Sequence, residues 1–299
     1  MRRTAVLTAF AAVSLLAAPA WAQDSANLGP TFTQGAKSRY ELTNKAKQVI
    51  NAPQGEMTID IDTTLVIACK VTAADSTGAT VQATIQELKT SLQSPMFADG
   101  FDSAKPAEQD ASSQLAPFIR PIVGKSFTVK FDPTGANADV TGIDTMLPND
   151  PQIAQIVAQA IGANGLGTAV VGFYVLKDGM EPVKVGETWT DTQDSPAQGL
   201  GTITITTNSK FTELANEVAT VTVDGNAKFV ADPAAAQQGV TMSIDESSID
   251  GVIKWGTGVD MLKELSSNST IVMSMSMQAM PGANQTMRII NSSSAKRLD

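Results

Sequence analysis

The sequence predicts a mainly β protein of the α+β class, built on one large curved antiparallel sheet or half-barrel with two inserted helices. The first observation behind this prediction is a run from Met57 to Val71 in which apolar and polar residues alternate, as in a strand with one buried face. The second is a series of shorter alternating segments after Gly199, separated by polar turns. The third is a change to helical spacing at two places in the first half of the chain.

The long alternating run determines the character of the sheet. A strand rises by about 3.3 Å per residue, so this run would be roughly 50 Å long, whereas the usual strand has about five or six residues. A strand of this length must twist, which favours a curved sheet. The turn at Asp75–Ala79 is expected to return the chain into a hairpin partner over residues 80–88.

Other strands are expected on both sides of this hairpin. One precedes it over residues 38–50, and one follows over 126–131, where the sequence is SFTVKF. The turn DPTGA then ends that strand. The second half of the chain is expected to contain strands over residues 202–207, 218–223, 227–231, 240–244, 252–255, 270–279 and 286–291.

Two segments have the apolar spacing of helices. Apolar residues at 115, 118, 119 and 122 recur on one helical face, but two interrupting prolines limit this segment to one or two short turns. The second helix is expected to begin at Pro151, with Asp150 as its cap, and to end near residue 162 or 165. The segment GANGLG at 162–167 is interpreted as the loop after this helix, because a phosphate-binding loop would follow a strand.

The first 22 residues have the pattern of a secretory signal peptide. Two arginines precede an apolar segment, and AWA at 20–22 is a cleavage motif. The apolar segment is shorter than the roughly 20 residues that span a bilayer. We therefore expect cleavage after Ala22, a periplasmic or secreted bacterial protein, and no transmembrane segment in the mature chain. The expected parts are a polar segment over 23–37, one β-rich domain over 38–292 or two parts divided near 165–185, and a tail over 293–299.

Composition argues against several classes of function. The chain has 21 Lys and Arg against 30 Asp and Glu, a net charge of −9, and loss of the two arginines of the signal peptide would make it −11. Nucleic acids and anionic membrane surfaces attract basic proteins, so neither is expected as a partner. The chain has no histidine, which excludes Ser-His-Asp and Cys-His catalysis and the usual zinc and haem ligands. The single cysteine, Cys69, cannot form an internal disulfide and is expected to be buried.

The segment TIVMSMSMQAM at 270–280 is rich in methionine, and Met273, Met275 and Met277 share one strand face. Thioethers select Cu(I), so a copper site is one hypothesis. The other is an adaptable apolar face that lines a core or a cavity. Side chains at i and i+2 of a strand lie about 7 Å apart and no histidine is present, so the apolar face is favoured and no metal or cofactor is expected.

Three further motifs support weaker hypotheses. Asp60 and Asp62 share one strand face and could act as an acid–base pair or bind calcium, but a solvated face explains them equally well. The segment DPTGANADVTGID lacks the spacing of a calcium loop. The segment SSAK, from Ser293 to Lys296, matches a Ser-x-x-K hydrolase pattern without its companion motifs. No residue is therefore assigned a catalytic role.

The segment VKVGETWTDT at 183–192 places a turn at Gly186 and begins a strand at Trp189, which is expected to fill the core. Together with FDPTGANADVTGID and MSIDESSIDGVIKW, it makes the chain resemble a family of exported bacterial β-rich proteins of unknown function, from Tyr40 to Ile290. That resemblance implies no catalytic residues. The long hairpin, inserted helices and later strands are also similar in architecture to the half-barrels of periplasmic lipoprotein carriers.

The leading hypothesis is a non-catalytic periplasmic protein that binds a lipid or other apolar ligand on the concave face of its sheet, under a cover formed by the two helices. One alternative is a structural protein, or one that contacts another envelope protein, with a dry core. A weaker alternative is a carboxylate or Ser-Lys hydrolase. The expected ligand-lining residues are Met273, Met275, Met277, Ile59, Ile61, Leu65, Phe118 and Ile156.

Overall fold

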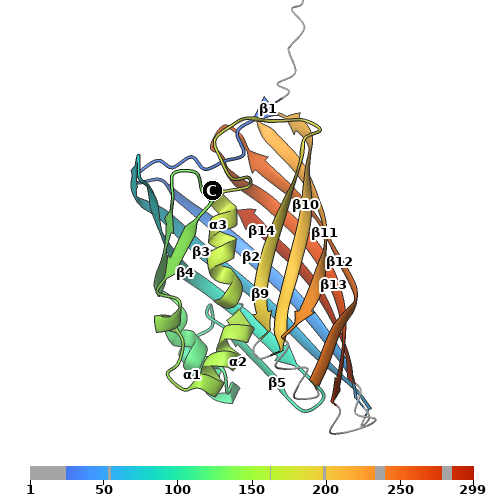
Figure 1. The fold of residues 1–299 in the computed structure, drawn as a ribbon. Helices are drawn as coiled ribbons and strands as arrows, with labels where there is room; N and C mark the ends of the chain where they lie inside the picture. The colour runs from blue at the N-terminus through green and yellow to red at the C-terminus, as the bar shows by residue number, and fades with distance from the viewer. Residues whose placement is uncertain (1–24, 53–54, 162, 198–199, 233–239, 278–284) are drawn as a thin grey trace, which may run out of the picture.

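The computed structural model of the chain describes residues 25–52, 55–161, 163–197, 200–232, 240–277 and 285–299, in which the main feature is a 12-stranded antiparallel sheet. The sheet curves into an open half-barrel, and helices lie on its concave side (Figure 1). The strand order is β7-β6-β4-β3-β2-β14-β13-β12-β11-β10-β9, with β5 also paired to β4. The predicted fold class, a mainly β protein with a large curved antiparallel sheet, is confirmed.

The first and last long strands of the chain join the two halves into one sheet, because β2 pairs with β14 along most of its length. A separate small sheet pairs β1 (Ser25–Ala26) with β8 (Val183–Lys184). The strands of the first half are β2 (Lys37–Ala52), β3 (Gly55–Asp75), β4 (Gly78–Gln93), β5 (Ala98–Asp102), β6 (Ser126–Phe131) and β7 (Ala138–Thr141). Those of the second half are β9 (Thr188–Ala197), β10 (Gly201–Ala215), β11 (Val218–Ala231), β12 (Val240–Gly256), β13 (Met261–Met277) and β14 (Gln285–Arg297).

Several strands are longer than the sequence predicts. β3 extends over 21 residues. The segments predicted as separate strands over 218–223 and 227–231 are one strand, β11, and those over 240–244 and 252–255 are both part of β12. Their polar middles fit within a strand because Asp224 and Asp250 are exposed on the outer face and Asp245 lies at a bulge of β12, which accommodates an extra residue.

Two of the three α-helices in the described residues lie where the sequence predicts them. α1 and the turn after it confirm the short first helix around Phe118. At the start of α2, the Ile153 amide donates to Asp150 Oδ1 at 3.1 Å. Within the described residues, no helix is both long and apolar enough to cross a membrane. The helices are α1 (Ala116–Ile119), α2 (Pro151–Ile161) and α3 (Ala163–Tyr174), with 3₁₀ turns over Ala107–Ser112, Arg120–Ile122 and Asp144–Met146.

α3 corrects the expectation of a loop at 162–167. The sequence does not predict this helix because α3 contains three glycines, and glycine is a poor helix former. Packing compensates, since Leu166, Val170 and Phe173 form a stripe that is at most 2% exposed. A Cβ added at Gly167 would lie 2.8 Å from a methyl group of Val140 in β7, so glycine at this position allows the helix to pack close to the sheet.

The main hydrophobic core lies between the helices and one end of the concave face. The rings of Tyr40 in β2 and Phe173 in α3 stack with their centroids 3.8 Å apart. Cys69 is buried in the same cluster, as expected for a lone thiol, and desolvation by burial raises its pKa to about 12. Trp189 in β9 is half-buried against this core, and the turn before it has Gly186 with a φ of 93°, a conformation that suits glycine.

Both ends of the described chain form hydrogen bonds with the rest of the protein. The predicted signal peptide lies within residues 1–24, outside the described residues. Leu28 is fully buried, and its carbonyl accepts hydrogen bonds from the amides of Leu176 and Lys177, both at 3.1 Å. Residues 293–297, which the sequence assigns to a tail, are the last residues of β14. Beyond them, Asp299 Oδ1 accepts a hydrogen bond from the Arg39 amide at 3.0 Å.

Candidate apolar binding site

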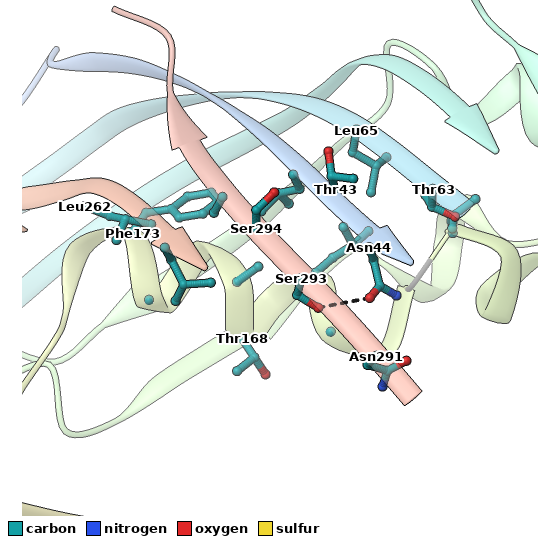
Figure 2. A pocket seen from close by; sticks show the side chains of 18 of the residues that line it. Thr43, Asn44, Thr63, Leu65, Thr168, Phe173, Leu262, Asn291, Ser293 and Ser294 are labelled. Atoms are coloured by element: carbon teal, nitrogen blue, oxygen red, sulfur yellow. Dashed lines mark hydrogen bonds between the residues drawn. The ribbon is translucent and has the colours of Figure 1, made fainter. Parts of the chain in front are cut away.

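A cavity of about 670 Å³ lies between helices α2 and α3 and the concave face of strands β2, β3, β13 and β14 (Figure 2). Strand alternation places the sheet residues there, because every second side chain of each strand points to the concave face. The apolar wall is formed by Leu42, Leu65, Leu262, Leu265 and Ala295 of the sheet and by Ala158, Ile161, Leu166, Ala169 and Phe173 of the helices.

The side of α3 that lines the cavity carries small residues, among them Gly165, Ala169 and Gly172. A Cβ added at Gly165 or Gly172 would meet no atom within 4 Å. Neither glycine has a positive φ, so alanine fits the backbone at both positions and would favour the helix. Glycine at these two positions therefore leaves open a space that a larger side chain could fill.

A row of polar residues crosses the cavity on the sheet. We call this row the polar belt, and it consists of Asn44, Thr63, Asn291 and Ser293. Asn44 of β2 lies opposite both Thr63 of β3 and Ser293 of β14. The Ser293 hydroxyl donates to Asn44 Oδ1 at 3.0 Å (Figure 2), and the hydroxyls of Thr63 and Thr90 of β4 lie 3.0 Å apart. These bonds between neighbouring strands hold the belt in place.

Asn291 is the member of the polar belt with an unmet hydrogen-bonding requirement. It lies opposite Ala46 of β2 and Ser269 of β13. Its side-chain oxygen is buried and has no hydrogen-bond partner among the described residues. A buried acceptor without a partner costs about 1–3 kcal/mol. A ligand group that donates a hydrogen bond here would remove that cost.

The cavity is uncharged as well as largely apolar. Among the described residues that line it, none has an ionisable side chain. Arg297, two residues beyond Ala295 on the same face of β14, has its Nε 3.6 Å from Asp299 Oδ1. An ionic ligand group inside the cavity would therefore lose its hydration without gaining a charged partner, which is strongly unfavourable.

Of the residues of the acid–base, calcium and Ser-x-x-K hypotheses, Ser293 belongs to the polar belt, whereas Asp60, Asp62 and Lys296 do not line the cavity. Asp60 and Asp62 are exposed on the outer face of β3. Ser293 and Lys296 are three residues apart in β14, so their side chains point to opposite faces of the sheet. The part of the chain that the structure describes contains no group of three or more Cys, Asp or Glu side chains that could hold a metal ion.

Beyond the polar belt, the concave face continues as a second apolar area, which we call the methionine–isoleucine field. Met273 is 8% exposed, and the other members are half-buried. Met242 and Met275 also line a smaller pocket of about 360 Å³. The field consists of residues on five adjacent strands, namely Ile50, Met57, Ile59, Met242, Ile244, Ile271, Met273, Met275, Met287 and Ile289.

The ligand-lining residues predicted from the sequence fall in separate places. Leu65 lines the cavity. Phe118 lies in α1, half-buried against the core, and is not among the described lining residues. Ile156 belongs to α2 and Met277 to β13, but their side chains lie outside the described residues. Ile59, Met273 and Met275 lie on the concave face beyond the polar belt. Ile61 lies in the register row of Asn291, because both are opposite Ala46.

Sequence reasoning missed the polar belt and the lining face of α3. One signal for the belt was present in the longest strand. Thr63 interrupts the apolar face of β3 between Ile61 and Leu65, at a position where the alternation requires an apolar residue. Its neighbours Asn44 and Ser293 become recognisable only through the strand register, which the sequence does not reveal.

Comparison with protein-family models and with curated proteins gives no match. Among solved structures, one described as showing lipid–protein interactions in lipovitellin is similar with a TM-score of 0.46 and 11% identity, over 90% of this chain and 26% of that chain. This chain therefore corresponds to about a quarter of that protein's length. DynF, from the dynemicin biosynthesis pathway of Micromonospora chersina, is similar with a TM-score of 0.20 and 10% identity, over 95% of this chain and 92% of that chain. At these values neither likeness assigns a family or a function to this chain.

Proposed function

We propose that this chain is a non-catalytic binding protein that holds a lipid or another apolar ligand in the cavity between α2, α3 and the sheet. The observation that carries the proposal is the cavity of about 670 Å³ with its apolar wall. Protein interiors are packed nearly as densely as organic crystals, whereas ligand pockets have volumes of about 300–1,000 Å³. A space of this size suits a ligand better than a structural core.

The glycines of α3 support ligand binding over the dry-core alternative. A glycine inside a helix costs about 0.8–1.0 kcal/mol relative to alanine. Gly172 is half-buried and faces open space, so a structural core would gain stability from a larger side chain at this position. The chain instead carries glycine where a side chain would reduce the volume for a ligand.

The methionine–isoleucine field provides a route to the cavity. It adjoins the polar belt on the same concave face, and its side chains are half-buried or nearly buried. Methionine is flexible and polarisable, so a face rich in this residue adapts to apolar molecules of different shapes. In our proposal a ligand crosses this field before it enters the cavity.

The proposal includes export to the periplasm or beyond. A cleavable signal peptide is expected at residues 1–22, and an apolar molecule needs a protein cover to cross an aqueous compartment. In this view the protein receives its ligand from, or passes it to, another component of the cell envelope. The acidic net charge, −9 for the full sequence, keeps such a protein in solution.

Uptake of the neutral dye Nile red by the purified mature chain tests the proposal. Gly172→Leu places a side chain in the cavity and is expected to weaken uptake by roughly tenfold or more, equivalent to about 1.4 kcal/mol. Gln155→Leu adds the same side chain to an exposed position of α2 and should leave uptake unchanged. Urea unfolding would verify that both variants fold. Absent uptake, or equal uptake by wild type and Gly172→Leu, would contradict the proposal and favour a dry core.

A further inference from the structure

We infer that the ligand of this cavity is an uncharged long-chain amphiphile whose polar group donates a hydrogen bond, such as a monoacylglycerol or a long-chain alcohol. Fatty-acid anions and phospholipids would be poor ligands. The inference rests on the proposed function and goes beyond it, because it specifies the chemistry of the ligand. Its basis is the distribution of polar, charged and apolar groups along the concave face.

The cavity itself is amphipathic. Its apolar sheet residues lie in one register row, in which Leu42 is opposite both Leu65 and Ala295. The next row on the same face contains Asn44, with Thr63 and Ser293 as its neighbours. Asn291 lies one row further from Leu42, because it precedes Ser293 by two residues in β14. One end of the cavity is therefore apolar and the other is polar. A ligand that fills both ends must itself have an apolar part and a polar part.

The polar end has a specific preference for a hydrogen-bond donor. Asn44 already accepts the hydroxyl proton of Ser293. Asn291 has a buried amide oxygen without a partner among the described residues. Ester and ether oxygens only accept hydrogen bonds, so they cannot satisfy this group, whereas a hydroxyl or an amide N–H can. The ligand is therefore expected to present a donor at Asn291.

The absence of charge in the lining selects against ionic groups. The described residues that line the cavity are all neutral, and Arg297, two residues beyond Ala295 of the lining, has its Nε 3.6 Å from Asp299 Oδ1. A carboxylate or phosphate would have to give up its hydration without a cation in return. A neutral polar group loses less hydration and can recover it through the hydrogen bonds of the belt.

Displacement of Nile red from the mature chain compares the two ligand classes. At about pH 8 a fatty acid in water is ionised, so oleate and 1-monooleoylglycerol there share one chain but differ in charge and in hydrogen-bond donors. Each is added as monomer, below the concentration at which it aggregates. We expect 1-monooleoylglycerol to bind roughly tenfold tighter or better, because burial of the carboxylate is not compensated.

Asn291→Leu tests the role of the polar belt directly. The change removes a buried amide oxygen that has no hydrogen-bond partner among the described residues, so the variant should fold at least as stably as wild type. Its affinity for 1-monooleoylglycerol should fall roughly tenfold, which reflects one buried hydrogen bond. Ser292→Ala, at an exposed position next to it, is the matched control and should change neither value.

The outcomes separate the inference from the proposed function. If wild type takes up Nile red but binds oleate as tightly as 1-monooleoylglycerol, the inference is overturned while the proposed function stands. If the preference for 1-monooleoylglycerol persists unchanged in Asn291→Leu, the assignment of the donor to Asn291 is overturned. If neither lipid nor the dye binds to wild type, the proposed function fails together with the inference.

Discussion

Asn44 and Ser293 lie 249 residues apart in the chain, yet the Ser293 hydroxyl donates to Asn44 Oδ1 at 3.0 Å. The bond crosses the pair β2–β14, where the first and last long strands join the two halves of the sheet. It also lies on the lining of the cavity. The same strand pair that holds the sheet together thus provides the polar end of the candidate site.

Replacement of the α3 glycines by alanine should change the free energy of unfolding in opposite directions, depending on the position. Gly165→Ala and Gly172→Ala add a methyl group in open space and should raise the free energy of unfolding by up to about 1 kcal/mol each, through helix propensity. Gly167→Ala would place its Cβ 2.8 Å from Val140 and should be destabilising. Urea unfolding measures all three, and a loss of stability in Gly172→Ala would show that the space is not open.

The stacked ring of Phe173 should be important for stability as well as for the cavity wall. It is 1% exposed and stacks on Tyr40, so Phe173→Ala should lower the free energy of unfolding by about 3–5 kcal/mol. Phe118→Ala, at a half-buried position of α1, should cost less. Equal losses in the two variants, measured by denaturant unfolding, would contradict the placement of the hydrophobic core under α3.

The methionine–isoleucine field should control ligand entry. Met275→Ser makes one half-buried position of the field polar and should slow the association of Nile red, with a stability change of about 1 kcal/mol or less because the site is only partly buried. Stopped-flow fluorescence measures the association rate. An unchanged rate would indicate that the ligand enters by another path.

The same variant distinguishes the copper hypothesis from the apolar one. The sheet brings methionines closer together than the spacing within one strand suggests, since Met242 lies opposite Met275 and Met287 lies opposite Met273. We still expect an apolar surface, because a cluster of neutral thioethers also serves as an adaptable lining. Competition for Cu(I) with a chromophoric chelator should therefore be equal for wild type and Met275→Ser. A Cu(I) affinity that collapses in the variant would support a metal site instead.

Cys69 gives a prediction for the pH dependence of stability. Burial raises its pKa from the ordinary value of 9.0 to about 12 in the folded protein. The pKa of this thiol is higher in the folded than in the unfolded protein. Its contribution to the free energy of unfolding is therefore complete below pH 9.0 and is lost as the pH rises towards 12. The free energy of unfolding of wild type should thus fall more steeply than that of Cys69→Ala, by at most about 1.4 kcal/mol per pH unit. Parallel curves above pH 9.0 would contradict the burial of the thiol.

The parts of the fold that depend on local pattern could be predicted from the sequence. The alternation around Ile61 and Leu65 predicts the longest strand, and Asp150 with Pro151 predicts the start of α2. α3 was missed because its glycines lower its intrinsic helix propensity, and only tertiary packing of residues such as Val170 restores it. Local pattern therefore accounts for β3 and the start of α2, whereas α3 depends on tertiary packing.

The candidate site was less predictable, because it depends on contacts between distant strands. Leu65 was expected on the lining and lies there. The polar belt needs the register of β2 against β14, which no local pattern encodes. Sequence reasoning also assigned a cover to the helix around Phe118, whereas the cavity is covered by α2 and α3.

The most direct test of ligand binding is mass spectrometry of an organic extract from the mature chain, purified in its native state after expression with its own signal peptide. We expect a stoichiometric, uncharged long-chain lipid with a hydroxyl or amide group, and its depletion from Gly172→Leu. An extract without lipid, from protein that also fails to take up Nile red, would contradict ligand binding and identify the cavity as part of a structural protein.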